Sequence, residues 1–166
     1  GLLERLVTLD DNAQRAADPL LRLSVLAVAV DEDREFLATR LRLSHAERDD
    51  LLIVDTRLLD LAKLDTAGQR RALYAIGAAR WHRLAMAGAA TAETTEGCAV
   101  WDELYALADR WPIPRFPLGG RDALALGLKP GRHIGALLAE LEAEWIAEDF
   151  AAAPAKLQER MAARAA

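Results

Sequence analysis

The residue types best suited to bind a ligand are concentrated in one stretch, RFPLGGRDALALGLKPGRHIG, at positions 115–135. Its charged and titratable side chains are Arg115, Arg121, Asp122, Lys129, Arg132 and His133. Four Lys or Arg residues and a single acid give this segment a local net charge of +3, whereas the whole chain has a formal net charge of −5. The cluster is therefore suited to contact individual phosphate groups, but the protein as a whole is not expected to attract a polyanion.

The glycines of this stretch predict a helix, a tight turn and a second helix. Gly127 has the position of a residue that follows a helix C-terminus, and Gly131 permits a turn conformation that most residues resist. A second helix that begins at Arg132 leaves the amides of its first residues unpaired and partially positive. The pattern therefore predicts a helix-hairpin-helix-like element near residues 120–149.

The start of the second helix is a candidate site for a backbone phosphate of a nucleic acid. Glycines at 131 and 135 remove side chains that would keep a phosphate away from the unpaired amides. The predicted phosphate-binding residues are Arg121, Lys129, Gly131, Arg132, His133 and Gly135. Such a site grips the backbone and does not identify bases. The glycines are equally explained if they only end and restart the helices of a bundle, so both interpretations stay open from the residues alone.

A second basic segment, Arg80-Trp81-His82-Arg83, is a weaker candidate for a phosphate contact. Arg80 and Arg83 lie one helical turn apart and would share a face. The alternative is a core tryptophan flanked by solvated arginines.

Other chemistries find little support in the chain. The three histidines, at 45, 82 and 133, are far apart and lack metal-binding spacing, so no metal or cofactor site and no catalytic residue is predicted. The single cysteine, Cys98, excludes an internal disulfide and a multi-cysteine zinc site. It favours a reducing compartment and the role of a small buried hydrophobic residue.

The composition predicts an all-α fold that positions these residues. Hydrophobic residues make up 52% of the 166 positions and charged residues 28%, which is typical of a globular chain. Ala, Leu, Arg and Glu favour helices, and no alternating pattern predicts a sheet. The small polar segment GAATAETTEG (Gly88–Gly97) predicts a boundary between a helical body, residues 1–88, and a helical tail, residues 89–166. No leader or membrane-spanning run is found, so a cytoplasmic protein is expected.

Several helix ends are marked by capping residues. Asp18-Pro19 predicts one start, and the capping boxes Ser44–Glu47 and Thr66–Gln69 predict two more. The helix from Thr66 is expected to carry Leu73, Ile76, Trp81 and Leu84. Further helices are predicted from Thr95 to Arg110, from Arg132 to Phe150 and after Pro154; the row of Glu140, Glu144 and Glu148 is interpreted as a solvated flank.

Three segments resemble one known family. They are PRFPLGGRD (114–122) with LGLKPG (126–131), Ile134-Gly135 and Trp145; DPLLRL (18–23); and LATRLRLSHAE (37–47). Together they resemble the C-terminal part of bacterial CCA-adding tRNA nucleotidyltransferases and poly(A) polymerases. Arg132 stands where that family usually has proline, and His45 where it has asparagine.

The resemblance implies a tRNA- or RNA-binding region of such an enzyme. It implies that the catalytic head lies N-terminal to this region, contacts it as a partner, and transfers nucleotides from ATP and CTP with magnesium. Gly119–Asp122 and Asp31–Asp33 are superficially similar to motifs of that head, but are expected only to start helices. The alternative is a helical protein-interaction module without an RNA role. The choice between CCA and poly(A) addition depends on the head, and the oligomeric state is not indicated by the sequence.

Overall fold

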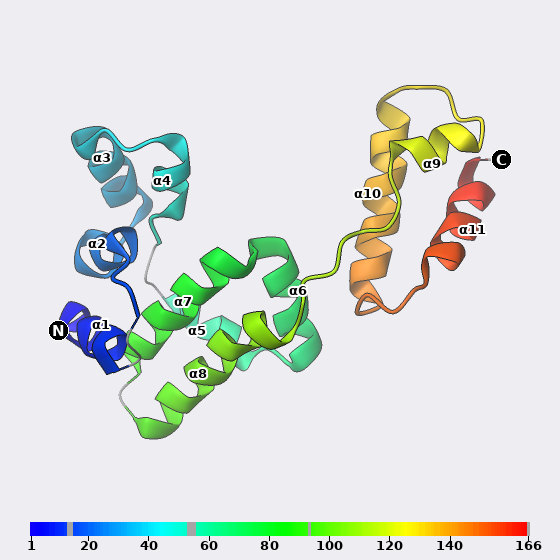
Figure 1. Ribbon diagram of the computed structural model, residues 1–166. Coiled ribbons are helices and arrows are strands. Elements are labelled where there is room, and N and C mark those ends of the chain that lie inside the picture. The colour runs from blue at the N-terminus through cyan, green and yellow to red at the C-terminus, as the bar shows by residue number, and fades with distance from the viewer. Residues whose placement is uncertain (13–14, 53–55, 93, 166) are drawn as a thin grey trace. The chain divides into compact units, whose positions relative to one another are not determined.

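The computed structural model describes residues 1–12, 15–52, 56–92 and 94–165 (Figure 1). Within these ranges the chain forms eleven α-helices and no strand, so the predicted all-α fold is confirmed. The chain divides into two compact units, Gly1–Ile113 (unit 1) and Pro114–Ala166 (unit 2). None of the described helices is long and apolar enough to cross a membrane.

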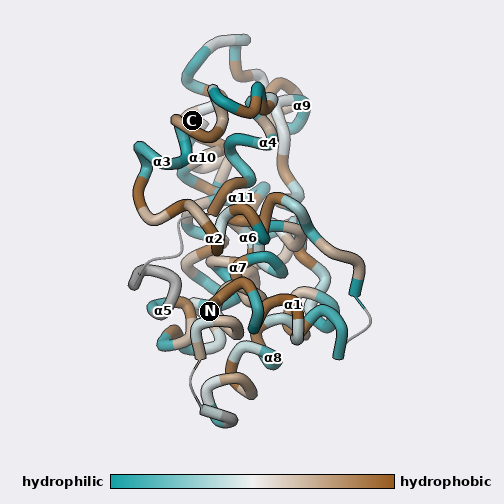
Figure 2. The backbone as a smooth tube through the Cα atoms, turned by 90° about the vertical axis from the view of Figure 1, so that its left-hand side faces the viewer, coloured by the Kyte–Doolittle hydropathy of each residue, from teal (hydrophilic) through white to brown (hydrophobic). Residues whose placement is uncertain are grey.

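Unit 1 is built around helix α7, Ala78–Thr91, which packs against α1 (Leu2–Asn12) and α8 (Thr95–Arg110). The other helices of the unit are α2 (Pro19–Ala27), α3 (Asp31–Leu41), α4 (His45–Asp50), α5 (Thr56–Lys63) and α6 (Thr66–Ile76). Hydrophobic and hydrophilic residues alternate along these helices (Figure 2). The apolar positions meet in a core whose largest members include Leu6, Leu52, Leu73, Trp81 and Trp101.

The first residues of the predicted linker Gly88–Gly97 belong to helix α7, which packs closely on α8. Gly88 is buried in α7, and a Cβ there would lie 2.4 Å from the ring of Trp101. The predicted boundary between residues 88 and 89 therefore falls inside a helix, whereas the two compact units divide after Ile113. Part of the predicted linker, Glu93, lies outside the described residues.

Two predicted helix starts in unit 1 are confirmed. The Asp18 carboxylate accepts hydrogen bonds from the amides of Leu20 and Leu21, both at 3.0 Å. At α4, the Ser44 hydroxyl accepts from the Glu47 amide at 3.2 Å, and the Glu47 carboxylate accepts from the Ser44 amide at 2.7 Å.

The predicted helix from Thr66 through Leu84 differs from the structure at its start and in its middle. Asp65, not Thr66, caps α6, because its carboxylate accepts from the Gly68 amide at 2.7 Å. The prediction of one helix is also wrong, because Gly77 has φ +83° and separates α6 from α7. A left-handed φ of this kind ends an α-helix and is readily adopted by glycine.

Unit 2 contains α9 (Gly120–Ala125), α10 (Arg132–Ala147) and α11 (Pro154–Ala165). Its buried apolar residues are Leu118, Ala123, Ile134, Leu141, Trp145, Ala152, Leu157 and Met161. The Trp145 ring lies 5.6 Å from Phe116 and 5.0 Å from Phe150, measured between centroids. α10 ends earlier than predicted, because Asp149 and Phe150 have positive φ values of 51° and 63°.

The glutamates of α10 do not form a simple solvated row. Glu144 accepts a hydrogen bond from Arg164, and Glu148 accepts one from Arg160 at 2.7 Å. The hydrogen bond from Arg160 lowers the pKa of Glu148. These pairs join the C-terminal half of α10 to α11 and neutralise the arginines of α11.

Candidate nucleic-acid interface

The turn after α9 has the geometry that the sequence predicts. Gly127 has φ +85°, its amide donates to the Leu124 carbonyl at 3.0 Å, and the Leu128 amide donates to the Ala123 carbonyl at 3.2 Å. This pair of bonds is the Schellman motif, in which the left-handed residue is usually glycine. The prediction of Gly127 as the residue after the helix is confirmed.

The first turn of α9 contains a carboxylate, which bonds the amide of the N-cap residue. The Asp122 carboxylate accepts a hydrogen bond from the Gly119 amide at 2.8 Å. Gly119–Asp122 is thus a helix start, as predicted. Because its carboxylate faces the backbone of its own helix, the single acid of the hairpin forms no ion pair with a described cation.

The start of α10 also has no side-chain cap among the described residues, and, unlike α9, it has no carboxylate in its first turn. Gly131 is the N-cap residue, with extended backbone angles of φ 168° and ψ 174°. The Ile134 amide donates to the Gly131 carbonyl at 3.2 Å, while the amides of Arg132 and His133 donate to no described residue. All three residues from 131 to 133 are exposed.

The space beside Gly131 is used by a neighbouring side chain. A Cβ at Gly131 would lie 2.8 Å from Nδ1 and 2.9 Å from Cε1 of His133. The imidazole therefore folds back over the glycine at the start of α10. A Cβ at Gly135 would meet nothing within 4 Å, so the helix surface there is open. The sequence predicted both glycines as members of the site, but not the contact between Gly131 and His133.

The cations of the hairpin are not neutralised within the described chain. Arg115, Arg121, Lys129 and Arg132 are exposed, and none of them has a hydrogen-bond or ion-pair partner among the described residues. Arg115 counted toward the predicted charge of the segment but was left out of the predicted site. Its exposure places it with the other three as a cation that an anionic ligand can reach.

Arg80 and Arg83 lie on α7 in unit 1 and have partners inside that unit. Arg83 donates through Nε to Asp18 at 2.6 Å and lies 2.7 Å from Asp50 through Nη1. Burial opposes the charge of this guanidinium, but the hydrogen bonds to Asp50 and Asp18 outweigh it and raise the pKa. Arg80 donates to the backbone carbonyl of Asp49. Both arginines thereby hold α4 against α7, and their contact with phosphate stays a prediction.

The tryptophan between them is a core residue. Trp81 is 1% exposed, and its indole N–H donates to the Leu104 carbonyl at 2.6 Å. His82, which follows it, lies 3.3 Å from the Asp109 carboxylate. The alternative interpretation of this segment, a buried tryptophan among arginines, therefore describes Trp81 correctly.

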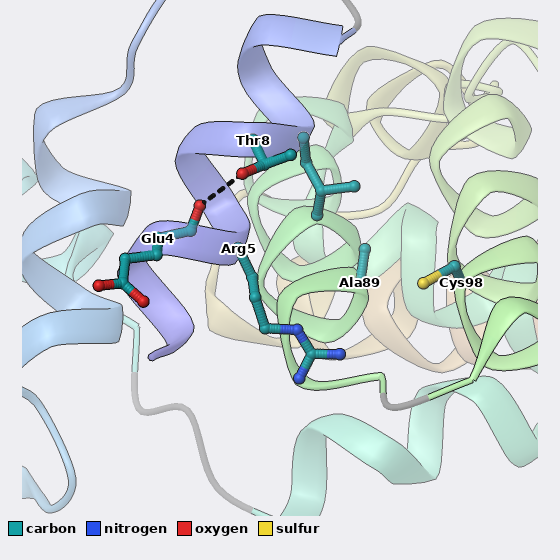
Figure 3. A pocket seen from close by; sticks show the side chains of 6 residues that line it. Glu4, Arg5, Thr8, Ala89 and Cys98 are labelled. Atoms are coloured by element: carbon teal, nitrogen blue, oxygen red, sulfur yellow. Dashed lines mark hydrogen bonds between the residues drawn. The ribbon is translucent and has the colours of Figure 1, made fainter.

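The remaining candidates for chemistry have structural explanations. Across the described ranges, no three His, Cys, Asp or Glu side chains are grouped so that they could hold a metal ion. Asp33 accepts from the Ala29 and Val30 amides at 3.0 and 3.1 Å, so Asp31–Asp33 starts α3 as predicted. Cys98 is only partly buried, in contrast to the prediction. It lines a pocket of about 270 Å³ together with Arg5 and Ala89 (Figure 3).

Comparison with known proteins gives one short similarity. Over 36 residues, 22% of the chain, the sequence is 50% identical to the protein "CCA tRNA nucleotidyltransferase 1, mitochondrial" of Danio rerio. This match covers 8% of the length of that protein. No protein-family model matches the chain, and no solved structure matches it. The resemblance to CCA-adding enzymes is therefore supported over a short segment.

Proposed function

We propose that this chain binds tRNA or another structured RNA through backbone phosphates at the turn between α9 and α10. In this proposal the chain is the RNA-holding region of a CCA-adding or poly(A)-adding nucleotidyltransferase. Nucleotide transfer, with magnesium, ATP and CTP, belongs to a catalytic head that lies elsewhere in the protein. The observation that carries the proposal is the uncapped start of α10, where the amides of Arg132 and His133 donate to no described residue and the exposed Lys129 and Arg132 have no described partner.

The chemistry of this site suits a phosphate group. Amides at a helix N-terminus carry partial positive charge, and the first turn of α10 has two that donate to no described residue. Lys129 and Arg132 flank Gly131 in sequence and are exposed. A backbone phosphate can accept from the amides and at the same time be attracted by these cations. No exposed acid lies between Lys129 and His133 to oppose it.

The short similarity supports RNA as the polyanion. The relative's name states that it is a CCA tRNA nucleotidyltransferase. By analogy, the ligand of this chain is a tRNA or a similarly folded RNA, and the task of the chain is to hold it while the 3′ end reaches the catalytic head. The proposal assigns the primary contacts to Lys129, Gly131, Arg132 and Gly135, with Arg121 and His133 in support.

The surfaces of α10 and α11 favour this proposal over a protein-interaction module. Among the described residues, none of the exposed large hydrophobic side chains lies on either helix. The acidic side chains that could serve as a docking face, Glu144 and Glu148, already bind arginines of α11. Unit 2 therefore has a positive hairpin, with Leu124 on α9 and Leu126 just after it exposed, and a pair of polar helices that, with the turn between them, retains an excess of acids, among them the exposed Glu140.

Fluorescence polarisation with labelled tRNA tests the proposal. Lys129→Glu and Arg132→Glu should each weaken binding and reduce the slope of log K against log salt by about one, because each removes a phosphate contact. Lys156→Glu makes the same charge change on an exposed residue of α11 and should change affinity little. If all three variants lose affinity equally, the hairpin has no special role and the proposal fails.

A further inference from the structure

Unit 1 contains a pocket that the function proposed above does not use. It has a volume of about 400 Å³ and lies where the end of α1, the start of α2, α7 and α8 meet. The residues important to the argument are Asp10, Arg15, Asp18, His82, Met86 and Tyr105. Pockets of about 300–1,000 Å³ are typical of sites for small organic ligands.

Both acids of the pocket are already satisfied. Asp10 is buried and accepts a hydrogen bond from Arg22 at 2.9 Å. Asp18 caps α2 and also binds Arg83. Neither carboxylate is therefore left to repel an anion or to bind a new cation.

Arg15 is the cation that lacks an acidic partner. Its Nη1 donates to the thioether sulfur of Met86 at 2.7 Å, and the centre of its guanidinium lies 4.0 Å from the centroid of the Tyr105 ring. No carboxylate pairs with it in the described part of the chain. A thioether is a weak acceptor, and a guanidinium presents five N–H donors in a planar fork, so most of its donors are left for a ligand.

Aromatic surface lies next to this cation. The rings of His82 and Tyr105 are stacked, with centroids 4.3 Å apart and planes at 30°. His82, Tyr105 and Arg15 are all only partly buried, so a ligand can reach them. Planar side chains of this kind favour stacking with a flat ring, while the guanidinium favours a phosphate, which it can bind with two parallel hydrogen bonds.

We propose that this pocket binds a nucleotide, with its phosphate on Arg15 and its base against the ring of His82, since His82 and Arg15 already lie against the Tyr105 ring. The ligand is a nucleoside monophosphate unit, either free in solution or part of an RNA strand. The pocket lies in unit 1, so the proposal does not depend on the hairpin of unit 2, and either can fail without the other.

Calorimetric titration of the full chain with AMP tests the site. AMP should bind at one saturable site, and Arg15→Gln should weaken it by about tenfold or more, because a charged hydrogen-bonded pair is lost. The matched control is Arg40→Gln, which removes the same charge from an exposed residue of α3 that has no partner among the described residues. Its affinity for AMP should stay within about twofold of the unsubstituted chain. Absence of AMP binding, or equal affinity in the Arg15→Gln variant, overturns the proposal.

A second measurement needs no substitution. The chain has two methionines, Met86 in the pocket and Met161 in unit 2, so methyl labelling gives one signal for the site and one internal control. AMP should shift the Met86 methyl resonance and leave that of Met161 in place. If neither moves, or if both move equally, the site is not where we infer it.

Competition with tRNA identifies the source of the nucleotide. If tRNA displaces AMP from the Met86 signal, the pocket takes a nucleotide of the RNA strand. If AMP still shifts Met86 when tRNA is bound, the ligand is a free mononucleotide. Both results support a nucleotide site, whereas a Met86 signal that responds to tRNA but never to AMP overturns it.

Discussion

Two helix junctions of this chain have the same turn geometry but opposite helix starts. α3 leads to α4 through Arg42, with φ +55°, and α9 leads to α10 through Gly127, with φ +85°. In both, the residue after the left-handed position donates its amide to the carbonyl five residues back, from Leu43 to Ala38 and from Leu128 to Ala123. The first helix of each junction therefore ends in the same way.

The second helices begin differently. α4 is closed by Ser44 and Glu47, whose side chains take each other's backbone amides. α10 begins at Gly131, where no described side chain takes the amides. The two starts therefore differ in charge: a carboxylate, that of Glu47, lies at the first turn of α4, whereas no acid lies between Lys129 and His133 at the start of α10. A carboxylate at a helix start opposes a phosphate, so a basic helix junction is not by itself an anion site.

A capping side chain at the start of α10 should have the largest effect on RNA affinity. Gly131→Asp supplies a side chain that accepts from the first amides of α10 and adds a negative charge. RNA affinity should fall by about 10- to 100-fold. The His133 imidazole, 2.8 Å from a Cβ at this position, has to turn aside, and the unfolding free energy of the chain should then rise by about 0.5 kcal/mol. Polarisation titration and urea unfolding measure the two quantities. Ala155→Asp places the same charge at the start of α11 and should leave RNA affinity unchanged; a loss there would mean that charge alone explains the result.

Substitutions at the two positive-φ residues, Gly127 and Arg42, should change the stability of units 2 and 1 in opposite directions. Gly127→Ala puts a side chain at a positive φ and should destabilise unit 2 by about 1–2 kcal/mol. Arg42→Gly removes a side chain from such a position and should stabilise unit 1 by up to about 1 kcal/mol. Amide hydrogen exchange reports each unit separately. A stabilised Gly127→Ala variant would contradict the described turn.

Removal of the cap at the start of α4 should destabilise unit 1 without creating a phosphate-binding site there. Ser44→Ala removes the hydroxyl that accepts from Glu47 and should destabilise unit 1 by about 1 kcal/mol. tRNA affinity should not change, because Glu47 still lies at the first turn of α4. A gain in affinity would show that the open hairpin has no special status.

The smallest expected difference between the starts of α4 and α10 is in the pH dependence of their amide protection. The hydrogen bond from the Ser44 amide, and then that from its hydroxyl, lower the pKa of Glu47 below its ordinary value of 4.5. A carboxylate with a lowered folded-state pKa stabilises the protein fully above the unfolded value, and this contribution is lost as the pH falls through the folded one. The Ser44 amide should therefore lose protection from exchange below about pH 4.5. Glu47→Gln should remove this dependence, and the start of α10, which has no carboxylate, should not show it.

Local signals in the sequence predicted the parts of the fold that depend on local contacts. Asp18, Ser44–Glu47 and Gly127 were assigned correctly, because a cap involves residues only a few positions apart. The end of α7 was not assigned correctly. Gly88 packs there against the Trp101 ring of another helix, and this contact is not visible in the local sequence. A run of small residues therefore predicts a linker when the helix that packs against it is unknown.

The features of the candidate sites also divide into those that local sequence predicts and those that depend on distant contacts. The exposed cations and glycines of the hairpin follow from composition and spacing. The engagement of Arg80 and Arg83 with α2 and α4 does not, since their acceptors lie more than thirty residues away in several cases. Nor does the pocket around Arg15, whose contacts with Met86 and Tyr105 join three distant segments.

The pairing of α10 with α11 has a consequence for the way unit 2 meets a polyanion. The unit carries equal numbers of basic and acidic residues, seven of each. Its uncompensated positive charge lies at the start of α10, and its glutamates lie toward the other end of a helix about 24 Å long. Such a neutral but polarised body has an electric dipole moment. In the field of a polyanion, such as the RNA of our proposal, a body of this kind would experience a torque more than a net pull, and its hairpin would face the polyanion first.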